Sequence, residues 1–318
     1  MFGSVWSIVA AFALCSSVGA ALAFAGPADV VPEAVENTGA WLASLQVPFV
    51  LAAGAVCVAV VAFGTRTLRP GGLDIGGERD VSGQTALIWA FAAGMVFILQ
   101  GFAVTLARAW LGVGRIEDAL GGVKASGAIA AVSGALGLMT AIGMAALLHR
   151  SSPKAGLRIR GRDTAVGAGL FLLLFPIVAG FGLVAAAAAS WMGVASGEAL
   201  AHETLREIRG NAGNIWTWGL VFQAVVAAPI IEELLYRGML QSAARRATGS
   251  AWAAVLLTSF FFAFMHWSIV PDGSRHQIVQ LFVLSVAMGA VFERTKSIGV
   301  AIVIHMLFNA LNIVMAIA

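Results

Sequence analysis

Three short groups of polar side chains interrupt apolar sequence in the last third of the chain. They are Glu232-Glu233-Leu234-Leu235-Tyr236-Arg237, Phe262 with His266, and His305 with Asn309. A charged group near the centre of a bilayer costs roughly 2.5–3.5 kcal/mol, so such residues usually face the protein interior and serve a function. Two carboxylates, two imidazoles and an amide have the chemistry to activate a water molecule for hydrolysis.

The two glutamates of the first group are expected to have different roles. Glu233 and Arg237 are four residues apart with the acid first, which is the favourable order for an ion pair on one helix face. Glu232 projects about 100° away from Glu233 on a helix. We therefore predict that Arg237 neutralises a structural Glu233, while Glu232 faces the site as a general base. The alternative is a purely structural cluster at a helix end, with Arg237 at the membrane interface.

Glu232 and His266 are nearly equidistant from the sequence Ala247-Thr248-Gly249-Ser250, and residue 249 is their midpoint. If two antiparallel helices meet at that turn, Glu232 and His266 lie at the same depth in the membrane. We predict that these two residues act together and that Phe262, one turn before His266, packs against the imidazole. A satisfied core histidine is the alternative.

His305 and Asn309 share one face of the last apolar segment, because they are also one turn apart. An imidazole and an amide at this spacing can donate to a developing oxyanion, and one such donor contributes about 3–4 kcal/mol in other acyl-transfer sites. Asn309 could instead link two helices by a hydrogen bond, as we expect of Asn312.

The elements that must position these residues are membrane helices. Hydrophobic residues make up 60% of the 318 residues and charged residues 11%, against about 25% charged in soluble domains. About 20 apolar residues span a bilayer as a helix. We predict an all-α, polytopic integral membrane protein with about eight or nine transmembrane helices and the catalytic site in the C-terminal helical bundle. The expected segments are 5–25, 46–64, 85–108, 126–148, 165–192, 215–236, 251–267, 277–292 and 298–317.

Loop charges set the expected orientation and the domain boundary. Most Lys and Arg residues lie in the loops that follow the second, fourth, sixth and eighth segments, the sixth loop beginning at Arg237, which places these loops in the cytoplasm. The basic stretch 151–162 separates residues 1–163, a membrane region of unknown role, from a catalytic domain at 164–318. Segment 5–25 lacks the basic residues that begin a secretory signal, which favours a retained helix over a cleaved one.

The motifs Glu-Glu-x-x-x-Arg, Phe-x-x-x-His and His-x-x-x-Asn, on successive apolar helices, resemble those of the CPBP intramembrane protease family. This family includes CAAX prenyl endopeptidases of the Ras-converting type and bacterial proteins linked to bacteriocin processing or self-immunity (Abi type). The resemblance covers about 215–318. It implies that Glu232 and His266 activate a water molecule and that His305 and Asn309 stabilise the oxyanion. Glu233, Arg237 and Phe262 support them.

The resemblance also implies a membrane protein or lipidated peptide as the substrate. Glu232, His266 and His305 could bind Zn²⁺, but the sequence lacks a His-Glu-x-x-His helix, so we favour a metal-independent mechanism without a required cofactor. We expect a cell-membrane location, with the site opening toward the cytoplasm, and no nucleic-acid partner. Two alternatives remain: a proton-coupled transporter using the same buried residues, and a non-catalytic immunity or scaffold protein.

Overall fold

The computed structural model describes residues 47–69, 71–112, 122–194 and 203–317. Within these ranges seven helices are long and apolar enough to cross a membrane, and a shorter apolar helix, α11, covers Ala251–Met265. The all-α, multi-pass membrane fold is confirmed, and the predicted segment 5–25 lies outside the described residues. The seven long helices are Val47–Gly64, α3 (Ala86–Trp110), α5 (Gly122–Ser151), α6 (Asp163–Trp191), Thr217–Thr248, α12 (Gln277–Thr295) and α13 (Ile298–Ile317).

Helix Thr217–Thr248 differs from its prediction because it continues 12 residues beyond position 236. It comprises α8 (Thr217–Phe222), η3 (Gln223–Ala227), α9 (Ala228–Glu232), η4 (Glu233–Leu240) and α10 (Gln241–Thr248). Arg237 is buried within this helix and does not begin a loop. The helix can continue because Arg237, Gln241 and Arg245 find polar partners inside the protein, so their side chains need not reach water.

The turn predicted at 247–250 is present and reverses the chain. Gly249 ends α10 with a positive φ of 68°, a conformation that glycine adopts without strain. Ser250 then begins α11 as its N-cap, with its side chain accepting a hydrogen bond from the Ala253 N–H at 3.3 Å. α10 and α11 therefore pack side by side, as the prediction of equal depth for Glu232 and His266 requires.

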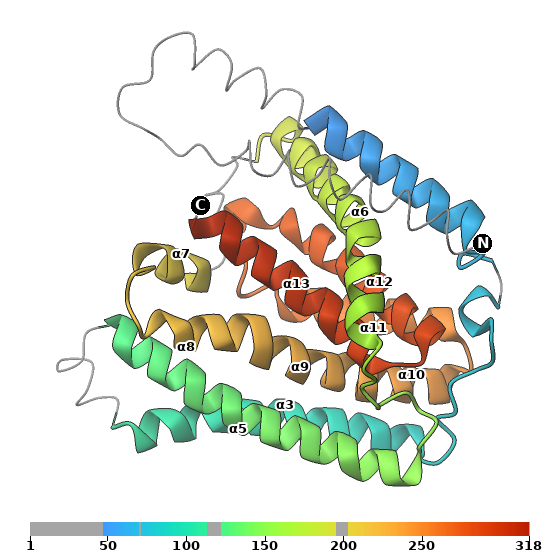
Figure 1. The fold of residues 1–318 in the computed structure, drawn as a ribbon, viewed down its shortest axis with the longest axis horizontal. Coiled ribbons are helices and arrows are strands. Elements are labelled where there is room, and N and C mark those ends of the chain that lie inside the picture. The colour runs from blue at the N-terminus through green and yellow to red at the C-terminus, as the bar shows by residue number, and fades with distance from the viewer. Residues whose placement is uncertain (1–46, 70, 113–121, 195–202, 318) are drawn as a thin grey trace.

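The helices form two groups around helix Thr217–Thr248 (Figure 1). α3 and α5 pair with each other along one side of it, while α6, α12 and α13 lie on the opposite side together with α11. The short helix α7 (Glu203–Gly210) lies beside α8 and α13. Helix Thr217–Thr248 is thus enclosed by other helices, which keeps its polar residues away from lipid.

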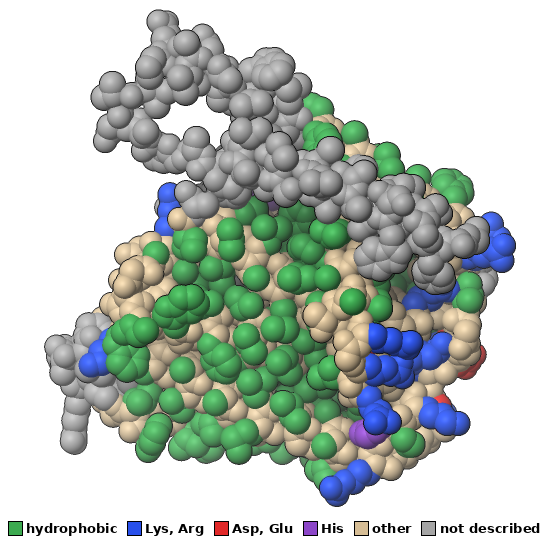
Figure 2. Space-filling view, in the orientation of Figure 1, with side chains coloured by type: hydrophobic (Ala, Val, Ile, Leu, Met, Phe, Trp, Pro, Cys, Tyr) green, Lys and Arg blue, Asp and Glu red, His purple; other side chains and the backbone are tan. Residues whose placement is uncertain are grey.

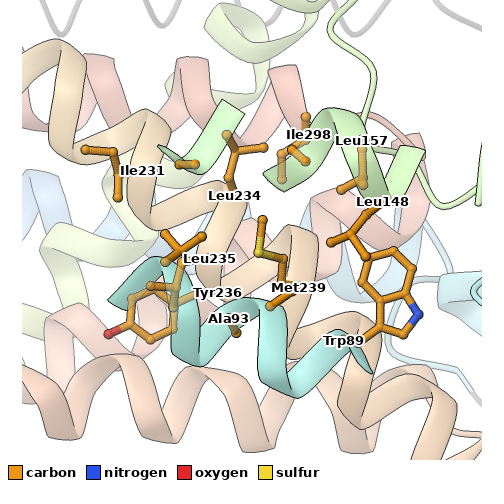
Figure 3. Close-up of a cluster of buried hydrophobic side chains, with 14 of the residues drawn as sticks. Trp89, Ala93, Leu148, Leu157, Ile231, Leu234, Leu235, Tyr236, Met239 and Ile298 are labelled. Carbon is orange, nitrogen blue, oxygen red and sulfur yellow. The ribbon is translucent and has the colours of Figure 1, made fainter. Parts of the chain in front are cut away.

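One apolar cluster joins the N-terminal helices to helix Thr217–Thr248 (Figure 3). Trp89 of α3 is fully buried there against Leu148 of α5 and Met239, and its indole N–H donates to the Val81 carbonyl at 3.2 Å. Residues before and after position 163 therefore share a core. The boundary at residue 163 stays a prediction.

Basic side chains gather at one end of the molecule, where α5 ends and α6 begins (Figure 2). Arg150, Arg158, Arg160 and Arg162 are exposed there, whereas the broad face beside this end is mostly apolar. A charged end next to an apolar flank fits a protein embedded in a bilayer, and this end is the predicted cytoplasmic one.

Candidate active site

Glu232 and Glu233 lie where helix Thr217–Thr248 changes its winding. The helix is α-helical through Glu232 and π-helical from Glu233 to Leu240, and a second π-helical turn covers Gln223–Ala227. Such wide turns inside α-helices occur frequently at functional sites, because they redirect side chains and free backbone groups. Both predicted glutamates are thus at an irregularity of the backbone.

Pro229 explains the first wide turn and the position of Asn309. The N–H of Ala228 donates to the Gln223 carbonyl, and Pro229 has no N–H, so the Ala224 carbonyl lacks a partner within its helix. The Nδ2 atom of Asn309 donates to this carbonyl at 2.8 Å. Asn309 therefore joins α13 to helix Thr217–Thr248, the linking role that the sequence left open. Its amide carries a second N–H, which this bond does not use.

Glu233 is fully buried and pairs with Arg237, as the spacing predicts. Its Oε1 atom lies 2.9 Å from the Nη1 atom of Arg237. The Nη2 atom of Arg237 donates to the hydroxyl of Ser285 on α12 at 2.8 Å. The other carboxylate oxygen of Glu233, Oε2, is buried and has no hydrogen-bond partner among the described residues.

His305 reaches both glutamates. Its Nδ1 atom is 2.9 Å from Oε1 of Glu233, and its Nε2 atom is 3.9 Å from Oε2 of Glu232. An ionised carboxylate only accepts hydrogen bonds, so this contact places a hydrogen on Nδ1 and directs Nε2 toward Glu232. The separation of 3.9 Å is too long for a direct hydrogen bond, and a water molecule can bridge such a gap. The side chain of Glu232 is 29% exposed, in contrast to Glu233.

His266 caps the end of α11. Its backbone N–H donates to the Ala263 carbonyl, so the Phe262 carbonyl is left without its usual helical partner. The Nδ1 atom of His266 lies 2.7 Å from that carbonyl oxygen. Because a carbonyl only accepts, Nδ1 carries the hydrogen and the neutral ring keeps a lone pair on Nε2.

The 15 residues of α11 extend for only about 22 Å, less than the thickness of the hydrocarbon core. His266 therefore ends its helix within the depth of the bilayer and not beyond it. Non-helical backbone at that depth occurs where it is buried in protein or lines a water-filled cavity.

The buried ring of Phe262 holds the site together. It packs against His266, as predicted, with a centroid distance of 4.6 Å, and against His305 with a centroid distance of 6.1 Å. The guanidinium of Arg237 lies 4.7 Å from the same ring, and the ring of Tyr236 meets it edge-on. Both imidazoles thus contact one aromatic ring, which connects the three motifs.

The described residues contain no group of three or more His, Cys, Asp or Glu side chains positioned to hold a metal ion. The Nδ1 atoms of His266 and His305 are engaged by the Phe262 carbonyl and by Glu233, which leaves the Nε2 atom of each ring free. The predicted ligand set for Zn²⁺, Glu232 with the two histidines, is not brought together as such a group in this arrangement. We derive no step through zinc.

Sequence reasoning missed two features of the site. Ser285 accepts from Arg237 although it lies 48 residues away, and no local spacing signals this bond. The bond between Glu233 and His305 was also missed, because Glu233 had been assigned only Arg237 as its partner. Asn312 was wrongly expected to link helices, since its Nδ2 donates to the Phe308 carbonyl of the same helix.

Comparison with known families supports the motif-based interpretation. Residues 214–311 match the family profile of the type II CAAX prenyl endopeptidases, Rce1-like. No curated protein and no solved structure matches the chain. The matched range contains Glu232, His266, His305 and Asn309. The C-terminal part of the chain is therefore similar to the Rce1-like type II CAAX prenyl endopeptidases, in agreement with the resemblance that its motifs indicate.

Proposed function

We propose that the protein is a CAAX-type intramembrane endopeptidase that hydrolyses peptide bonds of membrane-associated or lipid-anchored substrates. The observation that carries this proposal is the pair formed by Glu232 and His305. A partly exposed carboxylate faces the Nε2 atom of a buried imidazole across 3.9 Å, and a second carboxylate holds that imidazole in place. A water molecule bound at this position has a general base on one side and a hydrogen-bonding ring on the other.

In the proposed mechanism, Glu232 removes a proton from the water, and the resulting hydroxide attacks the carbonyl carbon of the scissile bond. His266 assists as a second proton acceptor through Nε2, because its Nδ1 is engaged by the Phe262 carbonyl. The proton taken from the water then passes to the leaving amine as the carbon–nitrogen bond breaks. These steps need no cofactor.

The oxyanion formed by this attack is held by His305 and Asn309. When His305 is protonated, its Nε2–H donates while Nδ1–H remains bonded to Glu233. The second N–H of the Asn309 amide completes the pair of donors, and its first N–H stays on the Ala224 carbonyl. Donors fixed in this way before the reaction lose little energy to reorganisation, which is how such sites stabilise developing charge.

We further propose a cell-membrane location, with the site reached from the cytoplasm. The predicted orientation supports this proposal, because the basic end of the molecule in Figure 2 then faces the cytoplasm. A cysteine introduced at exposed Ser151, at the basic end from which the site would be reached, should react with a membrane-impermeant maleimide added to inverted vesicles. Reaction only in right-side-out cells would place the opening on the outer side.

The test of the function compares new peptide termini in membranes from cells that carry the wild type and cells that carry Glu232→Gln. Termini present only with the wild type establish proteolysis and identify substrates. In a second arm, the two purified proteins are incubated with a farnesylated peptide ending in a CAAX sequence. Glu78→Gln, at a 74% exposed side chain, is the matched control and should behave like the wild type. If both proteins are expressed equally and the same peptide termini are found with each, the result would favour a transporter or a scaffold protein.

A further inference from the structure

Tyr236 lies one turn after Glu232 on the same helix, and the proposed mechanism does not use it. It is the only tyrosine in the chain, and its side chain is buried, with the residue 7% exposed. The ring packs edge-on against Phe262, with a centroid distance of 5.1 Å and an interplanar angle of 78°. Phe262 in turn contacts both imidazoles, so Tyr236 adjoins the site through a rigid aromatic contact.

The hydroxyl of Tyr236 has no hydrogen-bond partner among the described residues. The hydroxyl oxygen is not among the buried polar atoms that lack a partner, so it is accessible although the ring is buried, and a ligand can reach it. In Figure 3 the hydroxyl oxygen lies at the outer edge of the apolar cluster and points away from the labelled aliphatic side chains. Tyr236 follows Glu232 by four residues, so both side chains leave the same stretch of one helix. The free hydroxyl therefore belongs to the same part of the helix as the proposed general base.

We propose that the Tyr236 hydroxyl binds the substrate by donating a hydrogen bond to a main-chain carbonyl next to the scissile bond. This inference rests on the proposed peptidase function. A peptide that enters a membrane protein loses water from its carbonyl groups and needs donors in exchange. Of the side chains that surround Phe262, Arg237 and the Nδ1 atom of His266 are already engaged, whereas the Tyr236 hydroxyl is a neutral donor without a partner.

The position of Tyr236 also limits which carbonyl it can bind. Four residues separate it from Glu232, a rise of about 6 Å along an α-helix and less in the wider winding that begins at Glu233. An extended peptide advances about 3.3 Å per residue. The bound carbonyl therefore belongs to one of the two residues next to the scissile bond, on the side that faces α10 and the basic end of the molecule.

The test uses Tyr236→Phe, which removes only the hydroxyl and keeps the ring against Phe262. Steady-state cleavage is measured with purified, lipid-reconstituted protein and the farnesylated CAAX peptide. We expect kcat/KM to fall about tenfold, mainly through KM, because the hydrogen bond forms in both the bound substrate and the transition state. Thermal stability should equal that of the wild type, since the removed hydroxyl has no hydrogen-bond partner among the described residues.

The matched control is Thr258→Val on α11, which likewise removes a hydroxyl that has no partner among the described residues. Thr258 lies two turns before His266, and we expect its variant to cleave at the wild-type rate. Wild-type kinetics for Tyr236→Phe would overturn the proposal. A clear loss of stability in Tyr236→Phe would also overturn it, because the hydroxyl would then have a partner within the protein.

A second set of peptides identifies the carbonyl. Each carbonyl near the scissile bond is replaced in turn by a thioamide, a weaker acceptor. At one position the replacement should slow the wild type but leave Tyr236→Phe unaffected, and the absence of any such position would contradict the proposal. Failure of the proposed function is distinguishable, because neither the wild type nor Glu232→Gln would then cleave any peptide.

Discussion

Two buried arginine–glutamate pairs joined by hydrogen bonds lie among the described residues, one at the basic end and one beside the proposed catalytic residues. In the pair at the basic end, Glu293 of α12 uses both carboxylate oxygens. Oε1 binds the Nη2 atom of Arg79 at 2.5 Å and Gln241 at 2.8 Å, and Oε2 binds the Nε atom of Arg79 at 3.0 Å. In the second pair, Glu233 uses only Oε1, which contacts both Arg237 and His305, while Oε2 has no described partner.

Arg79 is also fully engaged. Its Nη1 atom donates to the Ala155 carbonyl at 2.9 Å and to the Ser242 hydroxyl at 3.0 Å, and its guanidinium lies over the Phe292 ring. Arg79 comes from the segment before α3, so this pair attaches the N-terminal part of the chain to α10 and α12. Around it, the Oε1 atom of Gln241 and the Nη1 atom of Arg245 lack hydrogen-bond partners.

The difference between the pairs indicates that the pair at Glu293 has a structural role, whereas the pair at Glu233 belongs to the proposed catalytic site. Both carboxylate oxygens of Glu293 are engaged by protein groups, so this pair stabilises the fold. Near Glu233, by contrast, three groups remain available: its own buried Oε2, the partly exposed Glu232 and the Tyr236 hydroxyl. Buried atoms without a described partner occur at both pairs, so what distinguishes the second pair is the contact of Glu233 with His305, whose Nε2 faces Glu232.

The largest expected effect comes from Glu232→Gln. The amide keeps the size of the side chain but cannot accept a proton, so cleavage should fall by about 10²–10⁴-fold, the usual contribution of a general base. The melting temperature should stay at the wild-type value, because the side chain has no direct hydrogen bond to break. Rates and melting curves of the same purified sample check both statements. Cleavage at the wild-type rate would remove Glu232 from the mechanism.

The next largest effect is the loss of the Arg79–Glu293 pair. Arg79→Met leaves Glu293 buried without its main counter-charge, and we expect a loss of about 3–5 kcal/mol in the free energy of unfolding. The double variant Arg79→Met/Glu293→Met removes both charges and should recover most of that loss. Unfolding in mixed dodecylmaltoside–SDS micelles measures these differences. Equal losses in the single and double variants would mean that the pair does not act as a unit.

The same substitution in both pairs tests the comparison directly. Glu233→Gln and Glu293→Gln each leave a buried arginine without a carboxylate, so both should lower the yield of folded protein. Only Glu233→Gln should lower the activity per folded molecule, by about 10–100-fold, because Glu233 also orients His305. Activity is normalised to the monodisperse fraction from gel filtration. A similar loss of specific activity in Glu293→Gln would show that the two pairs do not differ in function.

Local spacing predicted much of this site, because residues four apart share a helix face. It gave the pair of Glu233 with Arg237, the contact of Phe262 with His266, and the turn around Gly249 that sets α11 beside α10. Local spacing could not predict contacts between residues that are far apart in the sequence. The bonds from Glu233 to His305 and from Arg79 to Glu293 join residues 72 and 214 positions apart, and only the packed helices bring them together.

The same limit applies to the length of helix Thr217–Thr248. Arg237, Gln241 and Arg245 resemble the start of a polar loop in the sequence. In the structure each of them has a partner on another segment: Ser285, Gly289 and Asp74. Hydropathy is a property of single residues and takes no account of their partners. The end of this helix was therefore predicted too early.

The smallest expected effect is that of chelators. It tests whether the carboxylate oxygens of Glu232 and Glu233 that lack partners among the described residues bind a metal ion. If those oxygens bind a cation, the difference between the Glu233 and Glu293 pairs reflects a metal site and not the use of Glu232 as a general base. Because the described residues offer no three-ligand group, we expect cleavage to change by less than about twofold in EDTA or 1,10-phenanthroline. Elemental analysis of the active protein should find zinc far below one atom per chain. Stoichiometric zinc, with activity lost on chelation and restored by zinc alone, would instead assign Glu232, His266 and His305 as ligands and would require these side chains to move together during the reaction.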